Sequence, residues 1–499
     1  MDMPQDVIPQ RTPASSRSIV GGAGVLLGGR FLGAILSWIG TALIARTLDG
    51  DHFGSFSFVF NLLGLLGLIA DFETTRIVLT EVGRSTEAEI RELTGKFMVF
   101  RIVLGLVAYA IALAAVAVGP YSSLEVQAVA IGGASLVIAS ALWSLISICQ
   151  AKRWLRLVAG ALLAGQVGQF AMIIALKQSG EGSMLRYIVP YVASDAIALV
   201  IVALGVRTSL PIRLSVDVQR WRRWITEAAP LALGSALGTL YFRIDSVMLT
   251  LLLPREARFY AVGTYQVGYK FSDLLAFVAP ALIAATLPTL ARAWPRDPVT
   301  FHATFRQAVV LTAVVAAFAV VMFSIFAEPV IVAAFDAKFS GAEASARWLV
   351  IAQALNFVSQ LAYVCLVSAD RRTLYPVVTM CGLAINVGLN FVLIPRHSVM
   401  GAATATIVTE VVVLLLLVAN IVDMPLRPLP VRAFVVTAAS AAGAGLSGWL
   451  VWRASVWPLG IAVGTAVYIG ALHIFNVDGP GGLPTLVRRS RFDRITEVV

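Results

Sequence analysis

The sequence has few of the residues that build disulfides and metal sites. It holds three cysteines and four histidines in 499 residues. Cys149, Cys365 and Cys381 lie in or beside apolar segments, without C-x-x-C spacing and without a histidine cluster nearby. This pattern argues against a disulfide framework, and we expect no metal site and no cofactor.

Charged residues and long polar segments are also scarce. Only 13% of the residues are charged, 59% are hydrophobic, and the mean hydropathy is +0.85. These values lie outside the usual range of soluble domains. No loop is much longer than one helix, so there is no room for a catalytic domain, and we expect a protein that is not an enzyme. Residues 1–18 are polar, and the first apolar run is long enough to span, so no removable signal peptide is expected.

Apolar runs of about 20 residues, the length that crosses a bilayer as a helix, recur along the chain. They predict an all-α, polytopic membrane protein with about fourteen transmembrane helices. We expect the helices near residues 19–45, 54–76, 97–118, 124–149, 157–176, 187–206, 225–253, 261–290, 308–327, 348–369, 374–394, 399–422, 432–452 and 455–475.

Most of the 38 lysines and arginines fall in loops on one side of these alternating helices. Positive loops face the cytoplasm, so both termini are predicted to be cytoplasmic. The net charge of +10 follows from this bias, and no nucleic-acid partner is expected. Within the spans, the cations are Arg30, Arg101, Arg243 and Lys270. Arg101 lies near a helix end, and we expect it to reach the interface.

An internal repeat connects the two halves of the chain. A shift of 209 residues places four residues on counterparts of like type: Arg46 on Arg255, Gly54 on Gly263, Phe56 on Tyr265 and Phe60 on Tyr269. Chance similarity between apolar helices is the alternative, but the shared order of Arg, Gly and aromatic residues favours duplication.

The repeat predicts six parts of the chain. They are a cytoplasmic N-terminal segment at 1–18, an N-lobe of six helices at 19–206, a cytoplasmic interfacial linker at 207–224 that contains Trp221 and Trp224, a C-lobe of six helices at 225–422, a peripheral helix pair at 423–475, and a basic cytoplasmic tail at 476–499.

Arg243 lies in the middle of an apolar helix and needs an explanation. Helical spacing aligns it with hydroxyl residues in one polar seam, formed by Ser235, Thr239, Ser246 and Thr250. An ionisable residue inside a bilayer faces protein or water, which makes it a functional-site hypothesis. A carboxylate on a neighbouring helix is the alternative. Asp245 points to another face of the helix, where a contact with a further helix would account for it.

Four sequence stretches resemble one known family. They are ARTLDGDHFGSFSF, YFRIDSVML, VGTYQVGYKFSDLL and NVGLNFVLIPRHSVMGAATATIVTE. Together they resemble bacterial polysaccharide-biosynthesis (O-antigen, Wzx-type) flippases of the multidrug, oligosaccharidyl-lipid and polysaccharide exporter superfamily, over roughly residues 15–475. One departure is the stretch IADFETTRIVLTEVGR, in which Phe72, Glu73 and Thr74 replace a Gly-Leu-Gly-like turn that the family often has.

The resemblance implies two six-helix lobes in a V around a central cavity. It also implies movement of polyprenyl-pyrophosphate-linked oligosaccharide from the cytoplasmic to the outer leaflet, by alternating access, for O-antigen, capsule or exopolysaccharide. The implied location is the bacterial inner membrane. The implied partners are the polyprenyl-linked oligosaccharide, membrane lipids, and polysaccharide polymerase and other assembly proteins.

Such a substrate needs cations for its pyrophosphate and hydrogen-bonding groups for its glycan. The candidate cations are Arg30, Arg243 and Lys270, although Lys270 could instead pair with Asp273 one turn away. The candidate glycan contacts are Asn61, Gln266, Tyr269, Gln353 and Asn356, with Tyr265, Gln360 and Tyr363 nearby, for which packing between helices is the alternative.

Three acidic residues within the spans are candidates for proton or ion coupling: Asp195, Asp273 and Glu410. Asp195 and Glu410 fall in matching places at a shift of 215 residues. Each could equally be the structural partner of a cation. Two other functions stay open, an ion-coupled exporter of organic cations, which would need an acidic cavity, and a membrane polysaccharide polymerase.

Overall fold

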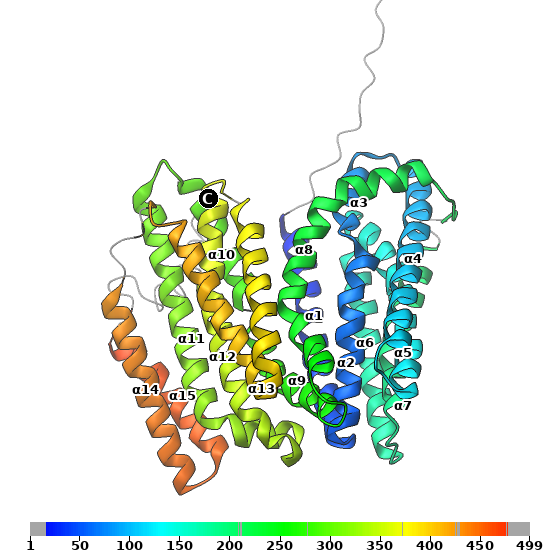
Figure 1. The fold of residues 1–499 in the computed structure, drawn as a ribbon. Helices are drawn as coiled ribbons and strands as arrows, with labels where there is room; N and C mark the ends of the chain where they lie inside the picture. Colours follow the sequence, from blue (N-terminus) through cyan, green and yellow to red (C-terminus); the bar gives the residue numbers. More distant parts are fainter. Residues whose placement is uncertain are drawn as a thin grey trace, which may run out of the picture. The chain divides into compact units, whose positions relative to one another are not determined.

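The computed structural model describes residues 16–207, 209, 212–276, 278–371, 373–424, 426, 430–475 and 477, and every regular element in these ranges is a helix (Figure 1). The predicted all-α class is confirmed. Ten helical segments in this part of the chain are long and apolar enough to cross a membrane, as expected for a multi-pass membrane protein. The expected N-terminal segment and basic tail lie almost entirely outside the described residues.

The helices follow one another closely along the chain. Their bounds are α1 Ser16–Thr47, α2 Gly50–Asp71, α3 Thr74–Arg84, α4 Glu87–Val118, α5 Ser123–Ala151, α6 Leu155–Gln178, α7 Met184–Val206, α8 Val218–Leu252, α9 Arg258–Ala276, α10 Val278–Ala293, α11 Pro298–Phe335, the 3-10 helix η1 Ala337–Ala342, α12 Glu343–Ser368, α13 Leu374–Ala419, α14 Val431–Ala454 and α15 Trp457–Ile474.

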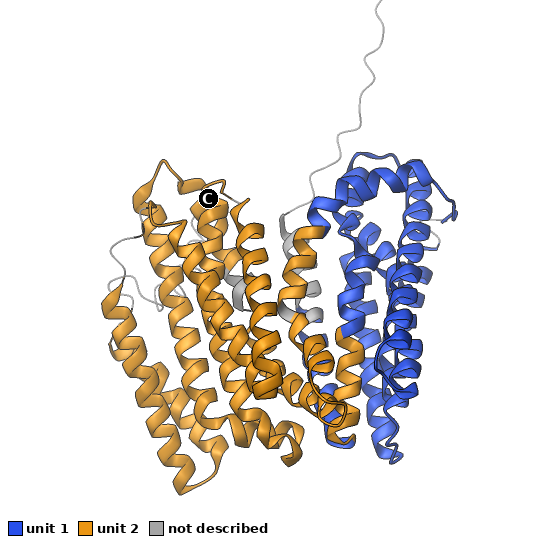
Figure 2. Ribbon diagram, viewed as in Figure 1, with its two compact units in different colours: residues 1–47, 62–232 blue, residues 48–61, 233–499 orange. Residues whose placement is uncertain are grey.

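The chain divides into two compact units, which Figure 2 shows in different colours. Unit 1 comprises Met1–Thr47 and Leu62–Ala232, and unit 2 comprises Leu48–Asn61 and Leu233–Val499. The dividing points fall inside α2 and inside α8, so each of these helices contributes residues to both units.

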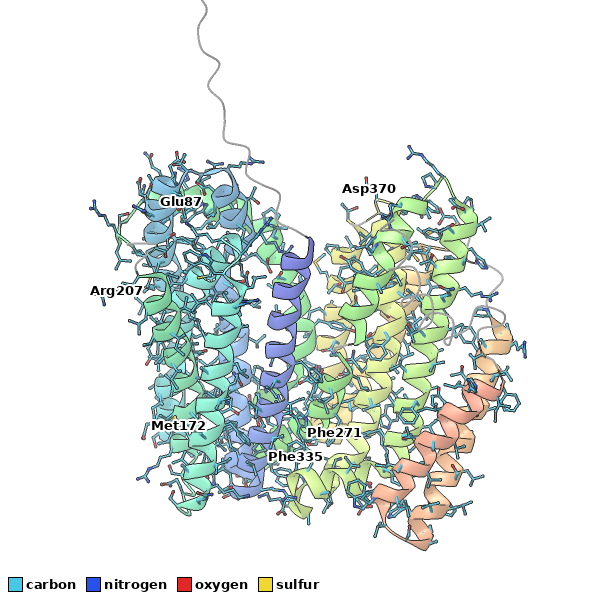
Figure 3. The ribbon with its side chains drawn as sticks, turned by 180° about the vertical axis from the view of Figure 1, so that it is seen from behind. Glu87, Met172, Arg207, Phe271, Phe335 and Asp370 are labelled. Atoms are coloured by element: carbon cyan, nitrogen blue, oxygen red, sulfur yellow. The ribbon has the colours of Figure 1, made fainter. Side chains whose placement is uncertain are left out.

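In unit 1, α4 packs on α5, and α6 packs on both α1 and α7. Gly165 lets α6 approach α7 closely, because a Cβ there would lie 2.6 Å from the carbonyl oxygen of Ser194. Glu87 at the start of α4 and Met172 in the second half of α6 lie toward opposite ends of this unit (Figure 3). Helices α1 and α6 run in the same direction, because Gly29, Gly33 and Gly40 of α1 face Ala159, Gln166 and Ile173 of α6 in the same order.

The start of α4 differs from the expected helix at 97–118. Thr86 and Glu89 form a capping box, in which each side chain binds the backbone N–H of the other residue. Because of this cap, α4 starts at Glu87, ten residues before the expected start at 97. The residues between these two positions were expected to form a loop and are helical. Lys96 is then held by ion pairs to Glu92 at 2.6 Å and to Asp217 at 2.8 Å.

The first turns of α8 replace the end of the predicted linker at 207–224. Asp217 caps the helix by accepting the backbone N–H of Arg220 at 3.0 Å. Trp224 is buried against Phe97 and Phe100, and its indole N–H donates to Glu81 at 3.0 Å. Trp224 is therefore packed inside unit 1, and the position of this segment at the cytoplasmic interface stays a prediction.

Arg101 is buried rather than extended to the interface as expected. Its side chain is 3% exposed and forms an ion pair with Asp71, at the end of α2. The same guanidinium donates to the hydroxyl of Thr75 at 3.3 Å. A partner on another helix stabilises the charge inside the unit, so Arg101 has no need to reach water.

In unit 2, α9 packs on α12 and contacts α11 through aromatic side chains. The Phe271 ring lies 5.8 Å from that of Phe335 and 4.9 Å from that of Phe323, centroid to centroid (Figure 3). Helices α14 and α15 pack closely where Gly448 and Gly460 face each other, since a Cβ on Gly448 would lie 2.7 Å from the carbonyl oxygen of Gly460.

The break expected between the helices at 374–394 and 399–422 is present inside α13. Ser398 is non-helical, at φ 50°, and a Cβ on Gly401 would lie 2.3 Å from the carbonyl oxygen of Leu393, so the chain turns back here. Pro395 precedes Ser398 and weakens the helix there. The helix expected at 261–290 corresponds to α9 and α10, and residue 277 between them lies outside the described residues.

The aligned glycines of the internal repeat meet in unit 2. A Cβ on Gly263 would lie 3.0 Å from the carbonyl oxygen of Gly50 and 3.2 Å from the nitrogen of Gly54. A Cβ on Gly54 would collide with the carbonyl group of Phe259. Glycine is therefore required at both positions because the first turns of α2 and α9 cross backbone to backbone.

Candidate functional site

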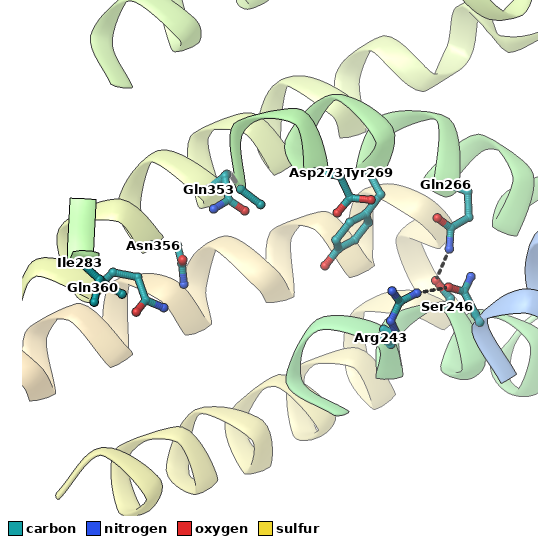
Figure 4. A pocket seen from close by; sticks show the side chains of 11 residues that line it. Arg243, Ser246, Gln266, Tyr269, Asp273, Ile283, Gln353, Asn356 and Gln360 are labelled. Atoms are coloured by element: carbon teal, nitrogen blue, oxygen red, sulfur yellow. Dashed lines mark hydrogen bonds between the residues drawn. The ribbon is translucent and has the colours of Figure 1, made fainter. Parts of the chain in front are cut away.

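A polar pocket of about 330 Å³ opens in unit 2 (Figure 4). Its lining comes from α2, α8, α9, α10 and α12: Asn61, Arg243, Ser246, Gln266, Tyr269, Asp273, Ala276, Ile283, Gln353, Asn356 and Gln360. Most of these residues carry amide, hydroxyl or charged groups. An apolar helix bundle places such groups together only where they face one another or water.

Arg243 lies at one end of the pocket, close to Ser246 and Gln266 (Figure 4). Its guanidinium donates to the side-chain oxygen of Asn61 at 3.1 Å, and Gln266 donates to the Ser246 hydroxyl at 3.2 Å. Within the described part of the chain, Arg243 is exposed and forms no ion pair. Its charge is therefore available to a ligand in the pocket.

Amide side chains line the pocket toward its other end, on α12. Gln353 accepts a hydrogen bond from Ser272 at 3.3 Å, which orients its amide. Asn356 donates to the carboxylate of Glu410 at 3.3 Å. Tyr269 lies between the two ends and packs edge-on against Tyr265, with ring centroids 5.1 Å apart. The pocket thus offers a cation, several amides and an aromatic ring.

Glu410 lies buried in α13, directly behind this lining. Its carboxylate accepts hydrogen bonds from the Tyr241 hydroxyl at 2.8 Å and from Asn356. Asn356 also lines the pocket, so one amide connects the carboxylate to the pocket wall. A change of charge or rotamer at Glu410 would reach the pocket through Asn356.

Asp245, predicted only as a helix contact, forms a second buried cluster. Its carboxylate accepts hydrogen bonds from Tyr265 at 2.6 Å, Asn390 at 2.7 Å and Thr406 at 2.9 Å. Three neutral donors stabilise the carboxylate without a cation. Asp245 therefore does not pair with Arg243, and the helix contact proposed for it is present.

Residues 19–294 match the model of a family described as polysaccharide biosynthesis protein. The chain belongs to this family. The match covers more than half of the sequence, and the family membership predicted from the four stretches is confirmed. A search of curated proteins by sequence found no match.

Solved structures with the same fold are transporters of the superfamily that the resemblance implied. A structure titled lipid II flippase MurJ, inward closed conformation, is similar with a TM-score of 0.68 and 14% identity over 91% of this chain and 99% of that one. An inward-facing multidrug resistance MATE family transporter has a TM-score of 0.64 and 13% identity over 80% and 98%. A superfamily transporter from Pyrococcus furiosus has a TM-score of 0.54 and 13% identity over 81% and 96%.

Six of the eight predicted cavity residues line the pocket in this member of the family. They are Asn61, Arg243, Gln266, Tyr269, Gln353 and Asn356. Lys270 follows Tyr269 in α9 but does not line the pocket. The side chain of Arg30 lies outside the described part of the structure.

The three predicted coupling residues fall in different places. Asp273 is exposed and lines the pocket, and Glu410 lies behind it. Asp195 lies half-buried in α7 of unit 1, with no hydrogen bond among the described residues.

The prediction missed Tyr241, although the sequence carried a signal for it. Tyr241 and Asp245 are four residues apart and share a face of α8 that Arg243 does not share. They contact Glu410 and Thr406, which are also four residues apart, in reverse order along α13. These paired spacings define an antiparallel contact between α8 and this part of α13.

Proposed function

We propose that this protein is a flippase that moves polyprenyl-pyrophosphate-linked oligosaccharide from the cytoplasmic to the outer leaflet for surface polysaccharide synthesis, including O-antigen, capsule or exopolysaccharide. The family is that of polysaccharide biosynthesis proteins, and the fold is that of superfamily transporters. The structure titled lipid II flippase belongs to a protein of the same fold, which supports a lipid-linked substrate.

The observation that carries this proposal is the exposed guanidinium of Arg243 in a polar pocket. An arginine that forms no ion pair inside a membrane protein needs an anionic ligand or water. Arginine suits a pyrophosphate because its planar fork donates paired hydrogen bonds and stays charged in a low dielectric. The neighbouring donor of Asn61, its side-chain nitrogen, is buried without a partner among the described residues and adds a second donor.

The amides and the tyrosine of the pocket are proposed to bind the glycan. Gln266, Gln353 and Asn356 each carry both a donor and an acceptor, which matches sugar hydroxyl groups. Arg30 and Lys270 are proposed to extend the cationic path. The polyprenyl chain would stay in lipid while the head crosses, as alternating access requires.

Glu410, Asp273 and Asp195 are proposed to couple transport to protons or ions. Glu410 has the strongest support, because Asn356 connects its carboxylate to the pocket. Replacing Glu410 with Gln removes the proton-binding group and keeps one acceptor for Tyr241. We expect this variant to respond less to an imposed pH gradient than the wild type.

The two-lobe arrangement of residues 19–206 and 225–422, the peripheral pair at 423–475, the inner-membrane location and the cytoplasmic termini are parts of the same proposal. Partners in polysaccharide polymerisation and assembly follow from the proposed pathway. An exporter of organic cations is less well supported, since its pocket would need an excess of carboxylates. Here the lining carries one carboxylate, Asp273, and one cation, Arg243.

The test is leaflet transfer in liposomes with a fluorescent polyprenyl-pyrophosphate oligosaccharide. Arg243→Ala should slow transfer by tenfold or more, because a charge-assisted hydrogen bond contributes about 1.5–3 kcal/mol. Arg243→Lys should retain part of the activity, since it keeps the charge and loses the fork.

Arg222→Ala is the matched control, because Arg222 is an exposed arginine in the first turns of the same helix. It should transfer lipid at the wild-type rate. Full transfer by Arg243→Ala would refute the role of Arg243, and transfer of organic cations by the wild type in place of the lipid would refute the flippase.

A further inference from the structure

A second cavity, of about 510 Å³, lies in unit 1 and has no role in the function proposed above. It lies where α2 ends and α3 begins, and the facing sides of α4 and α5 close it. Its volume is within the range of small-molecule sites, and its lining combines polar groups with an aromatic ring. The class of ligand can be argued from that lining.

The charges of this cavity cancel among themselves. Arg101 forms an ion pair with Asp71, and Arg76 pairs with Glu73 at 3.1 Å. All four residues line the cavity, and their formal charges sum to zero. A phosphate would meet two carboxylates and a cation would meet two guanidinium groups, so an uncharged polar ligand fits best.

The hydrogen-bonding groups suit a ligand rich in hydroxyl groups. Ser140 donates to the carbonyl of Leu136 at 2.6 Å, and Ser147 donates to that of Trp143 at 2.7 Å. Ser147 also lies 3.5 Å from the hydroxyl of Thr75, and each serine oxygen has two lone pairs that can accept. Arg101 supplies donors, because its Nε is buried without a partner among the described residues. The cavity therefore offers acceptors and donors side by side.

Trp143 gives the cavity an apolar wall. Its side chain lines the cavity. A flat aromatic ring beside several polar groups matches a sugar, which has an apolar C–H face and a rim of hydroxyl groups.

The backbone beside this cavity is strained. Phe72 and Glu73 adopt φ values of 46° and 51°, in the left-handed region that glycine occupies without cost. Glu73 also lines the cavity and makes the ion pair with Arg76. A residue other than glycine is kept in such a conformation where its side chain has a role. Here that residue is Glu73, whose side chain lines the cavity.

We propose that this cavity is a sugar-binding subsite, which takes one uncharged ring of the lipid-linked oligosaccharide while the pyrophosphate binds elsewhere. The subsite rests on the proposed function, since it assigns part of the same substrate to unit 1. Trp143 stacks on the ring, the serine oxygens accept from its hydroxyl groups, and Arg101 donates to it.

The test compares two lipids bound to the full-length protein in nanodiscs: polyprenyl pyrophosphate, and the same lipid carrying a neutral oligosaccharide of several sugars. The wild type should bind the glycosylated lipid about tenfold more tightly, the ratio that one well-placed group gives. Trp143→Ala and Glu73→Gly should reduce this ratio below about threefold and leave the Kd of the bare lipid unchanged.

Two controls separate the subsite from a loss of folding. Trp143→Phe keeps an aromatic wall and should restore most of the preference. Glu73→Gly relieves the left-handed strain, so its melting temperature should equal or exceed that of the wild type while its sugar preference falls.

The outcomes separate this inference from the proposed function. Arg243→Ala should weaken both lipids equally and keep their ratio, and an unchanged affinity there would count against the proposed function alone. The subsite is refuted if the wild type binds both lipids equally, if Trp143→Ala and Glu73→Gly keep the tenfold preference, or if they weaken the bare lipid as much as the glycosylated one.

Discussion

The pocket of unit 2 and the cavity of unit 1 each contain an arginine from a long helix, but the two arginines have different partners. Arg101 in unit 1 is 3% exposed and forms an ion pair with Asp71. Arg243 in unit 2 is exposed, donates to Asn61, and forms no ion pair among the described residues. Arginine is thus paired with a carboxylate in unit 1, whereas in unit 2 its charge is available to a ligand.

The difference depends on the partners of the nearby carboxylates. In unit 2, Asp245 accepts from Tyr265, Asn390 and Thr406, and Glu410 accepts from a tyrosine and an asparagine. Neutral donors stabilise these carboxylates, so neither draws Arg243 into a salt bridge. An arginine in a membrane protein therefore stays available to a ligand when neutral groups donate the hydrogen bonds that the nearby carboxylates need.

The largest effect is expected on stability, when the same substitution is made separately at each of the two arginines. Arg101→Met should destabilise the protein by about 2 kcal/mol, less than for a fully buried pair because Asp71 remains partly exposed. Arg243→Met should change stability by no more than about 0.5 kcal/mol, because it breaks no ion pair. Thermal unfolding in detergent measures both, and equal losses would contradict the distinction.

Removing a neutral donor tests whether the carboxylates of unit 2 depend on such donors. Tyr241→Phe deletes the hydroxyl that donates to Glu410 at 2.8 Å and should cost about 1 kcal/mol of stability. Tyr363→Phe is the matched control, since Tyr363 also lies in unit 2, packs on another tyrosine, and donates no hydrogen bond to Glu410. Equal stability of the wild type and Tyr241→Phe would show that Glu410 does not need this donor.

The acidic residue of the pocket gives a smaller effect. Asp273 lines the pocket together with Arg243, so Asp273→Asn removes a negative charge from the site and keeps a similar shape. The affinity for polyprenyl pyrophosphate should rise about threefold, as a partly solvated charge interaction implies. Gln353→Glu should lower it, and an unchanged affinity in both variants would place the pyrophosphate elsewhere.

The smallest effect is a pH dependence in unit 1. Hydrogen bonds from the Lys96 side chain and the Arg220 backbone lower the pKa of Asp217, which lies outside the membrane-spanning segments. A lowered folded-state pKa stabilises the fold above the unfolded-state pKa, and this contribution is lost as pH falls through the folded-state value. The melting temperature of Asp217→Asn should therefore lie below that of the wild type at about pH 7 and approach it at about pH 3.

The sequence alone predicted the helical class, the family and six residues of the pocket. Polar residues in apolar helices are informative, because lipid tolerates them only where they face one another, a ligand or water. Arg243 and Gln353 stood out on that ground without any structure. The starts of α4 and α5 could also have been predicted from the sequence, since Thr86–Glu89 and Ser122–Glu125 follow the capping-box spacing.

The partners of these residues could not be predicted in the same way. Tyr241 and Glu410 are 169 residues apart, and Arg101 and Asp71 are 30 apart. Helical periodicity assigns each residue to a face but does not say which face meets which. Arg101 was therefore expected at the interface, and the packing of Trp224 against Phe97 and Phe100 was not predicted.

The antiparallel contact between α8 and α13 restricts how these helices can slide. Tyr241 faces Glu410, and Asp245 faces Thr406. A slide of one helical turn, about 5.4 Å, in one direction would bring the carboxylates of Asp245 and Glu410 together in a buried place. The same slide in the other direction would leave Glu410 without its tyrosine. We therefore expect Arg243 and Asn356 to move as one rigid body in any change of conformation, so that a ligand bound to both would be carried with them.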